Sequence, residues 1–237
     1  METREFEAML ALDERHWWYR GRRRMLAALL EGVSPGERVL DAGCGSGRTL
    51  DELTRYGTAH GVELNPLGLA AARGRGHRVE EARVETIPFD DGSFDLVTCL
   101  DVIEHTDDDV VALSELRRVT RPGGHLVVSV PAHPRLWSRH DEVNGHRRRY
   151  TRRTLRAAAE AAGWRVERLT GFNVAYLAPA ALVRIGRRKD GDGTDSELEL
   201  TPPRLDALLE LPLRAEAALV RRGVDLPPGL SLMAVLR

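Results

Sequence analysis

Cysteine, lysine and long apolar runs are all scarce in this 237-residue sequence, and the scarcity of cysteines and of apolar runs each excludes a class of protein. The two cysteines, Cys44 and Cys99, are too few for a disulfide framework or a thiolate metal cage. No stretch approaches the roughly 18 consecutive apolar residues that a transmembrane helix needs. Acids follow Met1 where a signal peptide has basic residues and then an apolar run. We therefore expect a cytoplasmic protein without a transmembrane segment.

A large charge of one sign is also lacking. The 35 arginines and lysines nearly balance the 36 acids, so the formal net charge is −1. Lys189 is the only lysine, and the frequency of arginine therefore reflects overall composition. A balanced charge does not indicate a nucleic-acid partner. We expect none, and either a monomer or a homodimer is compatible with the sequence.

What the sequence does contain is a regular alternation of β-rich and helical segments. Strands are expected at 38–41, 60–64, 78–84, 94–100, 125–130 and 164–169, and helices near 48–56, 66–73, 107–120 and 151–162. Such alternation predicts an α/β fold whose parallel sheet is covered by helices on both faces. A last strand at 230–236, after a helix at about 203–222, is expected to return antiparallel beside the sixth strand.

The ends of the chain depart from this alternation. Apolar residues at helical spacing predict an amphipathic helix over residues 3–18, and a second helix ends at Ser34-Pro-Gly36. The charged, glycine-rich residues 187–196 are typical of a loop. We therefore expect four parts: a helical cap (1–35), a cofactor-binding core (36–170), a helical lid or insertion (171–229) and the final strand of the core sheet (230–237).

The stretch Val39-Leu-Asp-Ala-Gly-Cys-Gly-Ser-Gly47 joins the first strand of the core to a helix. Glycines let a backbone turn sharply and approach a ligand, and the helix N-terminus offers unpaired N–H groups with a partial positive charge. Glu63 ends the next strand, where its carboxylate can accept hydrogen bonds from a ribose diol. The pattern predicts a nucleoside ligand with a polar or charged tail.

The spacing of the glycines distinguishes between nucleoside ligands. Gly43-x-Gly45-x-Gly47 is one residue shorter than the dinucleotide pattern G-x-G-x-x-G, and no Gly-Lys-Ser/Thr follows as in a phosphate-binding P-loop. This spacing argues against a nucleotide-dependent oxidoreductase, which stays as an alternative that a binding comparison with NAD would test.

Five motifs occur in the order of class I S-adenosylmethionine-dependent methyltransferases, and they are most similar to the small-molecule branch with the quinone-biosynthesis enzymes. They are Val39–Gly47, Gly61–Pro66, Ile87–Asp95, Asp101–His105 and Arg121–Gly124. The resemblance implies a Rossmann-like three-layer sandwich with a seven-stranded, mostly parallel sheet and an antiparallel last strand. It implies methyl transfer from S-adenosyl-L-methionine, leaving S-adenosyl-L-homocysteine, to oxygen, nitrogen or carbon of a small-molecule acceptor. A fold relative that binds the cofactor without methylating, as another catalyst or a binding partner, stays open.

The resemblance also implies which residues contact the methionine and ribose parts of the cofactor. Gly43, Gly45 and Gly47 would line the methionine part, with Asp41 at its amino end. Glu63 would hold the ribose hydroxyls.

Further contacts are implied at the adenine and at the sulfonium. Leu64 would pack against the adenine, and Val84 and Glu85 would lie at its edge. Leu100 and Asp101, at the end of the fourth strand, would face the sulfonium and the acceptor.

The aromatic stretch His16-Trp-Trp-Tyr-Arg20 is implied to close over the cofactor, as in similar enzymes. An arginine can bind a carboxylate through two hydrogen bonds, and a tyrosine or tryptophan can lie over a sulfonium. Tyr19 and Arg20 are therefore predicted cofactor contacts. For Trp17 two roles are equally expected: contact with the cofactor, or packing of the N-terminal helices on the sheet.

Catalytic candidates follow the fifth strand, at the carboxyl ends of the strands. A base is needed only where the acceptor must lose a proton, and the candidates are His133, His140 and His146. The favoured ones are His140, with Asp141 beside it, and His146. Either histidine can instead be a surface residue of a polar loop. The basic run from Arg147 to Arg156 is either a solvated helix start or an anion site. Together with the apolar segment 172–186, an anion site suggests a lipid-like acceptor, and weak membrane or lipid contact is left open.

The group Asp101, Glu104 and His105 raises the question of a metal. In some quinone O-methyltransferases an acid-x-x-Glu-His group at this place binds a divalent ion, which can orient an acceptor. His105 at a helix start is otherwise an ordinary capping or cofactor-side residue. We predict no metal site from the sequence.

Overall fold

The computed structural model describes residues 3–33, 36–182 and 205–237. The loop expected at 187–196 lies outside these ranges. The described part contains a single seven-stranded sheet, with strands β1 (Arg38–Ala42), β2 (Thr58–Glu63), β3 (Arg78–Glu81), β4 (Phe94–Leu100), β5 (Thr120–Pro131), β6 (Val166–Phe172) and β7 (Ser231–Leu236).

The strand order is β3-β2-β1-β4-β5-β7-β6. The first five strands pair in parallel, and β7 inserts antiparallel between β5 and β6. The predicted fold class is therefore confirmed, including the antiparallel last strand. The order reverses between β1 and β4, and such a switch point is where open α/β sheets bind ligands.

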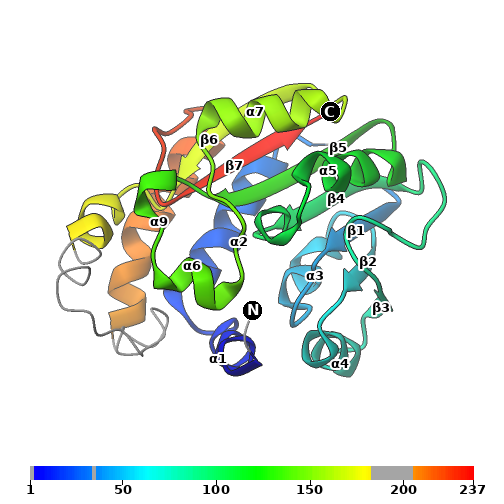
Figure 1. The fold of residues 1–237 in the computed structure, drawn as a ribbon, viewed down its shortest axis with the longest axis horizontal. Coiled ribbons are helices and arrows are strands. Elements are labelled where there is room, and N and C mark those ends of the chain that lie inside the picture. Colours follow the sequence, from blue (N-terminus) through cyan, green and yellow to red (C-terminus); the bar gives the residue numbers. More distant parts are fainter. Residues whose placement is uncertain (1–2, 34–35, 183–204) are drawn as a thin grey trace.

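The helices form a layer on each face of the sheet (Figure 1). They are α1 (Thr3–Leu12), α2 (Trp17–Leu30), α3 (Arg48–Leu53), α4 (Pro66–Gly74), α5 (Asp109–Val119), α6 (Arg139–Asn144), α7 (Arg152–Ala161) and α9 (Asp206–Arg221), with short 3-10 turns η1 (Ile103–His105) and η2 (Pro134–Leu136). Apolar side chains of α5 and α7 pack on one face, and those of α2, α3 and α9 pack on the other.

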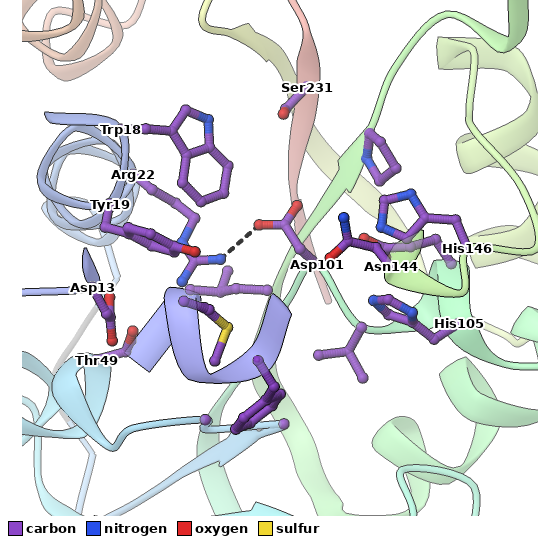
Figure 2. Close-up of a pocket in the computed structure, with 18 of the residues that line it drawn as sticks. Asp13, Trp18, Tyr19, Arg22, Thr49, Asp101, His105, Asn144, His146 and Ser231 are labelled. Atoms are coloured by element: carbon purple, nitrogen blue, oxygen red, sulfur yellow. Dashed lines mark hydrogen bonds and ion pairs between the residues drawn. The ribbon is translucent and has the colours of Figure 1, made fainter. Parts of the chain in front are cut away.

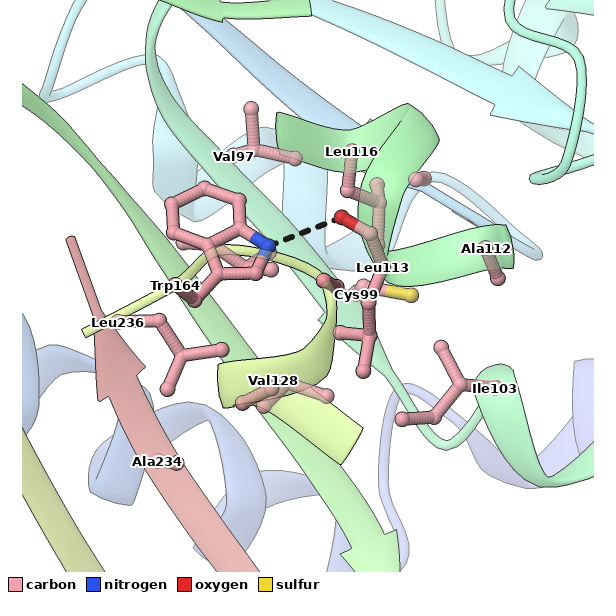
Figure 3. Close-up of a cluster of buried hydrophobic side chains, with 14 of the residues drawn as sticks. Val97, Cys99, Ile103, Ala112, Leu113, Leu116, Val128, Trp164, Ala234 and Leu236 are labelled. Carbon is pink, nitrogen blue, oxygen red and sulfur yellow. Dashed lines mark hydrogen bonds between the residues drawn. The ribbon is translucent and has the colours of Figure 1, made fainter. Parts of the chain in front are cut away.

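The core under α5 is closed by an aromatic side chain from the loop before β6. Trp164 is buried among Val97, Leu116 and Leu236, and its indole N–H donates to the carbonyl oxygen of Leu113 at 2.9 Å (Figure 3). A buried indole keeps its polar atom satisfied in this way. This packing ties α5 to β6 and β7.

Two predictions about helices were incomplete. The helix expected over 3–18 ends at Leu12, and α2 starts at Trp17, because His16 caps α2 by accepting the N–H of Trp18 at 3.3 Å. Helix α6 was missed, since its sequence is polar and has no apolar period. Its signal was the capping box formed by Ser138 and Asp141.

Candidate active site

A cavity of about 810 Å³ lies at the carboxyl ends of the central strands, beneath α1 and α2. Its volume falls within the roughly 300–1,000 Å³ that is typical of small-molecule sites. One part is lined by the glycine loop and the end of β2, and the other by residues of η1 and α6. The cavity therefore has room for two molecules that meet near the end of β4.

The glycine loop owes its shape to backbone that other residues rarely adopt. Gly43, Gly45 and Gly47 have φ values of 79°, 53° and 79°. A Cβ on Gly43 would lie 2.4 Å from Val102, and one on Gly47 would lie 2.9 Å from Ala72. Gly43 and Gly45 line the cavity, whereas Gly47 caps α3 and packs against α4.

The carboxylate of Glu63 is held rigidly at the end of β2. Its two oxygens accept the N–H groups of Gly45 and Asn65, each at 2.7 Å, and the residue is only 7% exposed. A carboxylate has about four acceptor positions, so two remain for hydroxyl donors in the cavity that Glu63 lines. This arrangement suits a vicinal diol.

Asp41, the penultimate residue of β1, is a second buried carboxylate on the cavity wall. Burial raises the pKa of Asp41 to about 6, although the Thr98 hydroxyl donates to its Oδ1 at 2.7 Å and opposes the shift. The nearby Glu63 carboxylate raises the pKa further. Once it is ionised, the Asp41 carboxylate can therefore stabilise a cationic group of a ligand in the cavity.

Helix α2 forms the facing wall with Trp18, Tyr19 and Arg22 (Figure 2). The guanidinium of Arg22 lies 5.0 Å from the ring centre of Trp18 and 5.4 Å from that of Tyr19, and its Nη1 donates to Asp101 at 2.6 Å. Burial by itself lowers the pKa of Arg22, but the Asp101 and Asp13 carboxylates raise it above its ordinary value. A fixed cation thus lies between the two parts of the cavity.

The opposite wall carries His105, Asn144 and His146 (Figure 2). Asp141 holds His146 by accepting from its Nδ1 at 2.9 Å, and the same carboxylate accepts from the Nε of Arg149 at 2.6 Å. Burial alone would raise the pKa of Asp141, but these hydrogen bonds bring it well below its usual range. The orientation of the His146 ring is therefore set by a buried ionised carboxylate.

Glu104 and His105 complete this wall from η1. Glu104 is 0% exposed, and no other described residue donates a hydrogen bond to either of its carboxylate oxygens. Burial, and then the neighbouring Asp101, raise the pKa of Glu104 well above its usual range. Burial and the nearby His146 ring lower the pKa of His105 to about 4.

Comparison with known proteins identifies the family to which this chain belongs. A model described as "Methyltransferase domain" matches residues 40–128. A probable S-adenosylmethionine-dependent methyltransferase from Mycolicibacterium smegmatis is 30% identical over 223 residues, which cover 92% of this chain and 84% of that protein. The chain belongs to the family of S-adenosylmethionine-dependent methyltransferases. The predicted family is confirmed, and so is the cofactor for which the family is named.

Other relatives match over a shorter range. The demethylmenaquinone methyltransferase from Tropheryma whipplei is 33% identical over 129 residues, or 52% of each chain, so this chain spans about half the length of that relative. Among solved structures, the [4+2]-cyclase SpnF has a TM-score of 0.61 at 19% identity, covering 93% of this chain and 82% of that one. The cyclase shares the fold alone.

The cavity fits the family's cofactor on its own geometry. Glu63 has acceptor positions for the ribose hydroxyls, Asp41 can hold the amino group, and Arg22 is a cation within reach of a carboxylate. Gly43 and Gly45 carry no side chains, so the loop leaves room for the amino-acid part to pass close to the backbone. Bound S-adenosylmethionine would supply an electrophilic methyl group on its sulfur.

Most of the predicted site residues lie on the cavity wall, and four do not. Those on the wall are Tyr19, Asp41, Gly43, Gly45, Glu63, Leu64, Leu100, Asp101, His140 and His146. Gly47 lies behind the loop, Val84 is in the core under α5, and Glu85 pairs with Arg83 at 2.9 Å.

Arg20 is the fourth residue off the wall, and Arg22 lies there in its place. Arg20 pairs with Glu210 of α9 at 2.6 Å. Residues two apart on a helix point to different sides, whereas Arg22 follows Trp18 by one turn and shares its face. That i, i+4 relation was the signal that could have selected Arg22 from the run of arginines.

Arg148 and Arg149, within the basic run that follows α6, are engaged with the protein. Arg148 donates to the carbonyl oxygens of Thr106 and Asp107 at 3.0 and 2.6 Å, and Arg149 is buried against Asp141. These contacts do not support the hypothesis of an acidic headgroup bound by this run. In the parts of the chain that the structure describes, no helix is long and apolar enough to cross a bilayer.

The pH dependence of cofactor binding is expected to follow Asp41. Its pKa of about 6 means that the carboxyl is ionised above pH 6 and neutral below. Because only the ionised form attracts an ammonium group, affinity for S-adenosylhomocysteine should be full above this pH and fall up to about tenfold per unit below it. Calorimetric titrations between roughly pH 5 and pH 8 measure this. Asp41→Asn should bind more weakly at pH 8 and lose the acid slope; an unchanged slope would contradict the assignment.

Proposed function

We propose that this chain transfers the methyl group of S-adenosylmethionine to an oxygen, nitrogen or carbon of a small apolar acceptor. The observation that carries the proposal is one continuous cavity in which the cofactor-suited half opens onto a half walled by Glu104, His105 and His146. The relative named for demethylmenaquinone supports a ring-bearing acceptor. Apolar and aromatic residues near the cavity's end, among them Trp17 and Pro179, suit the body of such a molecule.

The residues contribute chiefly by positioning and by excluding water. Glu63 and Asp41 hold the cofactor at both ends, and side chains of α1 and α2 form part of the wall around it. Holding an acceptor at contact distance in a dry site supplies much of the rate of such a displacement. Asp101, at the end of β4 with a positive φ of 57°, lies where the two halves meet.

The acceptor half of the cavity also contains histidine side chains that can accept a proton from the acceptor. Asp141 fixes the Nδ1–H tautomer of His146, which leaves the lone pair of Nε2 available toward the cavity. His140 also lines the cavity, next to the amide of Asn144. His146 is the better oriented of the two predicted catalytic histidines, and we propose that it takes part in catalysis.

The test is incubation with methyl-labelled S-adenosylmethionine and a panel of hydroquinones, phenols and amines, beside calorimetry with S-adenosylhomocysteine. Label transfer to at least one acceptor is expected. Failure to bind the homocysteine product would contradict the proposal outright. Binding with no transfer to any acceptor would instead favour the alternative, a fold relative that binds the cofactor without methylating.

Arg22 offers a prediction with a matched control. Arg22→Met is expected to weaken S-adenosylhomocysteine binding by roughly 30- to 100-fold, because a buried cation opposite a carboxylate is lost. Arg20→Met is the control, because it also removes a guanidinium from α2. The Arg20 side chain pairs with Glu210 and does not line the cavity. Binding by Arg20→Met should stay within about twofold of the unmodified protein. Equal losses in the two variants would exclude a direct role for Arg22.

A further inference from the structure

The wall opposite α2 brings together three side chains that can ligate a metal. One ligand atom each from Glu104, His105 and His146 lies within 4.8 Å of the other two. We propose that these three side chains bind one divalent transition-metal ion on the acceptor side of the cavity. The binding is independent of the proposed function, whereas the use of the ion described below rests on it.

Glu104 carries the first part of the argument. It is fully buried, and no other described residue donates a hydrogen bond to either of its carboxylate oxygens. A buried carboxylate without a partner is costly, so such a group either stays protonated or binds a cation. Its position on the cavity wall leaves room for that cation.

The two histidines are oriented as metal ligands are. Asp141 accepts from Nδ1 of His146, and the backbone carbonyl of Gly145 accepts from the ring of His105. A ligating histidine nearly always has its second nitrogen fixed by a carboxylate or a carbonyl in this manner. The two rings meet at 4.8 Å between centres and 76° between planes, so their remaining nitrogens can converge on one point.

Asp101 is not part of this set, although its spacing to Glu104 and His105 resembles a metal-binding pattern. Its carboxylate turns toward α2 and pairs with Arg22 at 2.6 Å (Figure 2). His146, which follows α6, lies in the third position instead. The segment that follows α6 thus supplies a nitrogen where the local pattern would supply an oxygen.

The donor set indicates the kind of ion. Two imidazoles and one carboxylate suit Zn²⁺, Fe²⁺, Co²⁺ or Mn²⁺, whereas Mg²⁺ and Ca²⁺ prefer oxygen ligands. Three protein ligands leave coordination positions open toward the cavity. If the chain methylates a hydroxyl, an ion there would hold the acceptor oxygen and favour release of its proton to water. His146 then contributes to catalysis as a ligand.

The experiment uses the full chain, stripped of metal with a chelator and titrated with Co²⁺. Saturable binding of one equivalent is expected, with the visible absorption of a cobalt ion bound by nitrogen ligands. Glu104→Gln and His146→Ala should each weaken binding at least about tenfold. His140→Ala is the matched control, because it lines the same cavity outside the three-residue cluster and should keep the cobalt spectrum.

A fourth variant separates the two possible ligand sets. Asp101→Asn should retain cobalt binding if His146 is the third ligand, and should lose it if Asp101 is. Thermal unfolding of each metal-free variant reports whether it is folded, and Co²⁺ should raise the melting temperature of the unmodified chain but not that of Glu104→Gln.

Three outcomes would overturn the metal site: no saturable cobalt binding, cluster variants that bind like His140→Ala, or loss of binding in Asp101→Asn. S-adenosylhomocysteine affinity and label transfer, measured on the same samples, test the proposed function separately. Cobalt bound at the cluster without transfer would leave the site standing and remove the function. Label transfer without cobalt binding would support the proposed function and exclude the metal site.

Discussion

Replacing Glu63 by alanine is expected to weaken S-adenosylhomocysteine binding by at least about 100-fold. Hydrogen bonds to a charged group contribute about 1.5–3 kcal/mol each, and a ribose diol would make two of them with this carboxylate. The substitution also removes the acceptors of the Gly45 and Asn65 N–H groups, which hold the loop in place. Isothermal calorimetry measures the loss directly.

The matched control for Glu63 is Glu81 on the neighbouring strand. Glu81 is its register partner in β3 but is exposed and absent from the cavity wall. Glu81→Ala should bind as the unmodified chain does. Glu63→Gln should fall between, because an amide keeps one acceptor oxygen. If all three variants bind alike, this carboxylate does not hold the ribose.

The second large effect is expected from Asp141→Ala. Asp141 is 0% exposed and accepts from His146, Arg149 and the N–H of Ser138, so its loss leaves the buried Arg149 guanidinium without its carboxylate partner. Breaking a buried pair from one side costs about 3–5 kcal/mol of stability. Urea denaturation should show this loss, and label transfer should fall because the His146 ring is no longer fixed.

A double variant and the pH dependence check this explanation. Asp141→Ala combined with Arg149→Met should recover part of the lost stability, because no buried charge is left unpaired. The pKa of Asp141 is below its usual range, so its contribution is full above the ordinary aspartate pKa and is lost as the pH falls well below that value. A double variant less stable than Asp141→Ala alone would contradict the pair as the cause.

The cofactor half of the site was largely predictable because its signals are local. Asp41, Gly43, Gly45 and Glu63 all lie on the cavity wall. Positive φ at the glycines and acids at strand ends follow from short sequence patterns, and adjacent parallel strands then bring those ends together. Val84 and Glu85 are absent from that wall, because the chain after β3 turns Val84 into the core.

The acceptor half was only partly predictable because its geometry depends on distant packing. His146 was a candidate, but its tautomer depends on Asp141 within a helix, α6, that has no apolar period. The sequence did not indicate that the Glu104 carboxylate is buried without a hydrogen-bond partner, because the same sequence pattern is compatible with a glutamate in an exposed turn. Arg22 differed from its neighbours only by the side of α2 that the sheet leaves facing the cavity.

By itself, the sequence determined the α/β alternation, the antiparallel last strand, the bare loop at Gly43–Gly47 and the family with its cofactor. The alternation and the loop follow from periodicity and backbone preference, which act over a few residues, whereas the family and its cofactor were implied by the resemblance of five short motifs. The tertiary structure alone decided that Arg22 and not Arg20 faces the cavity, and that His146 joins Glu104 and His105. Side-chain direction and contacts between distant segments are set by how helices pack on the sheet, which no local pattern encodes.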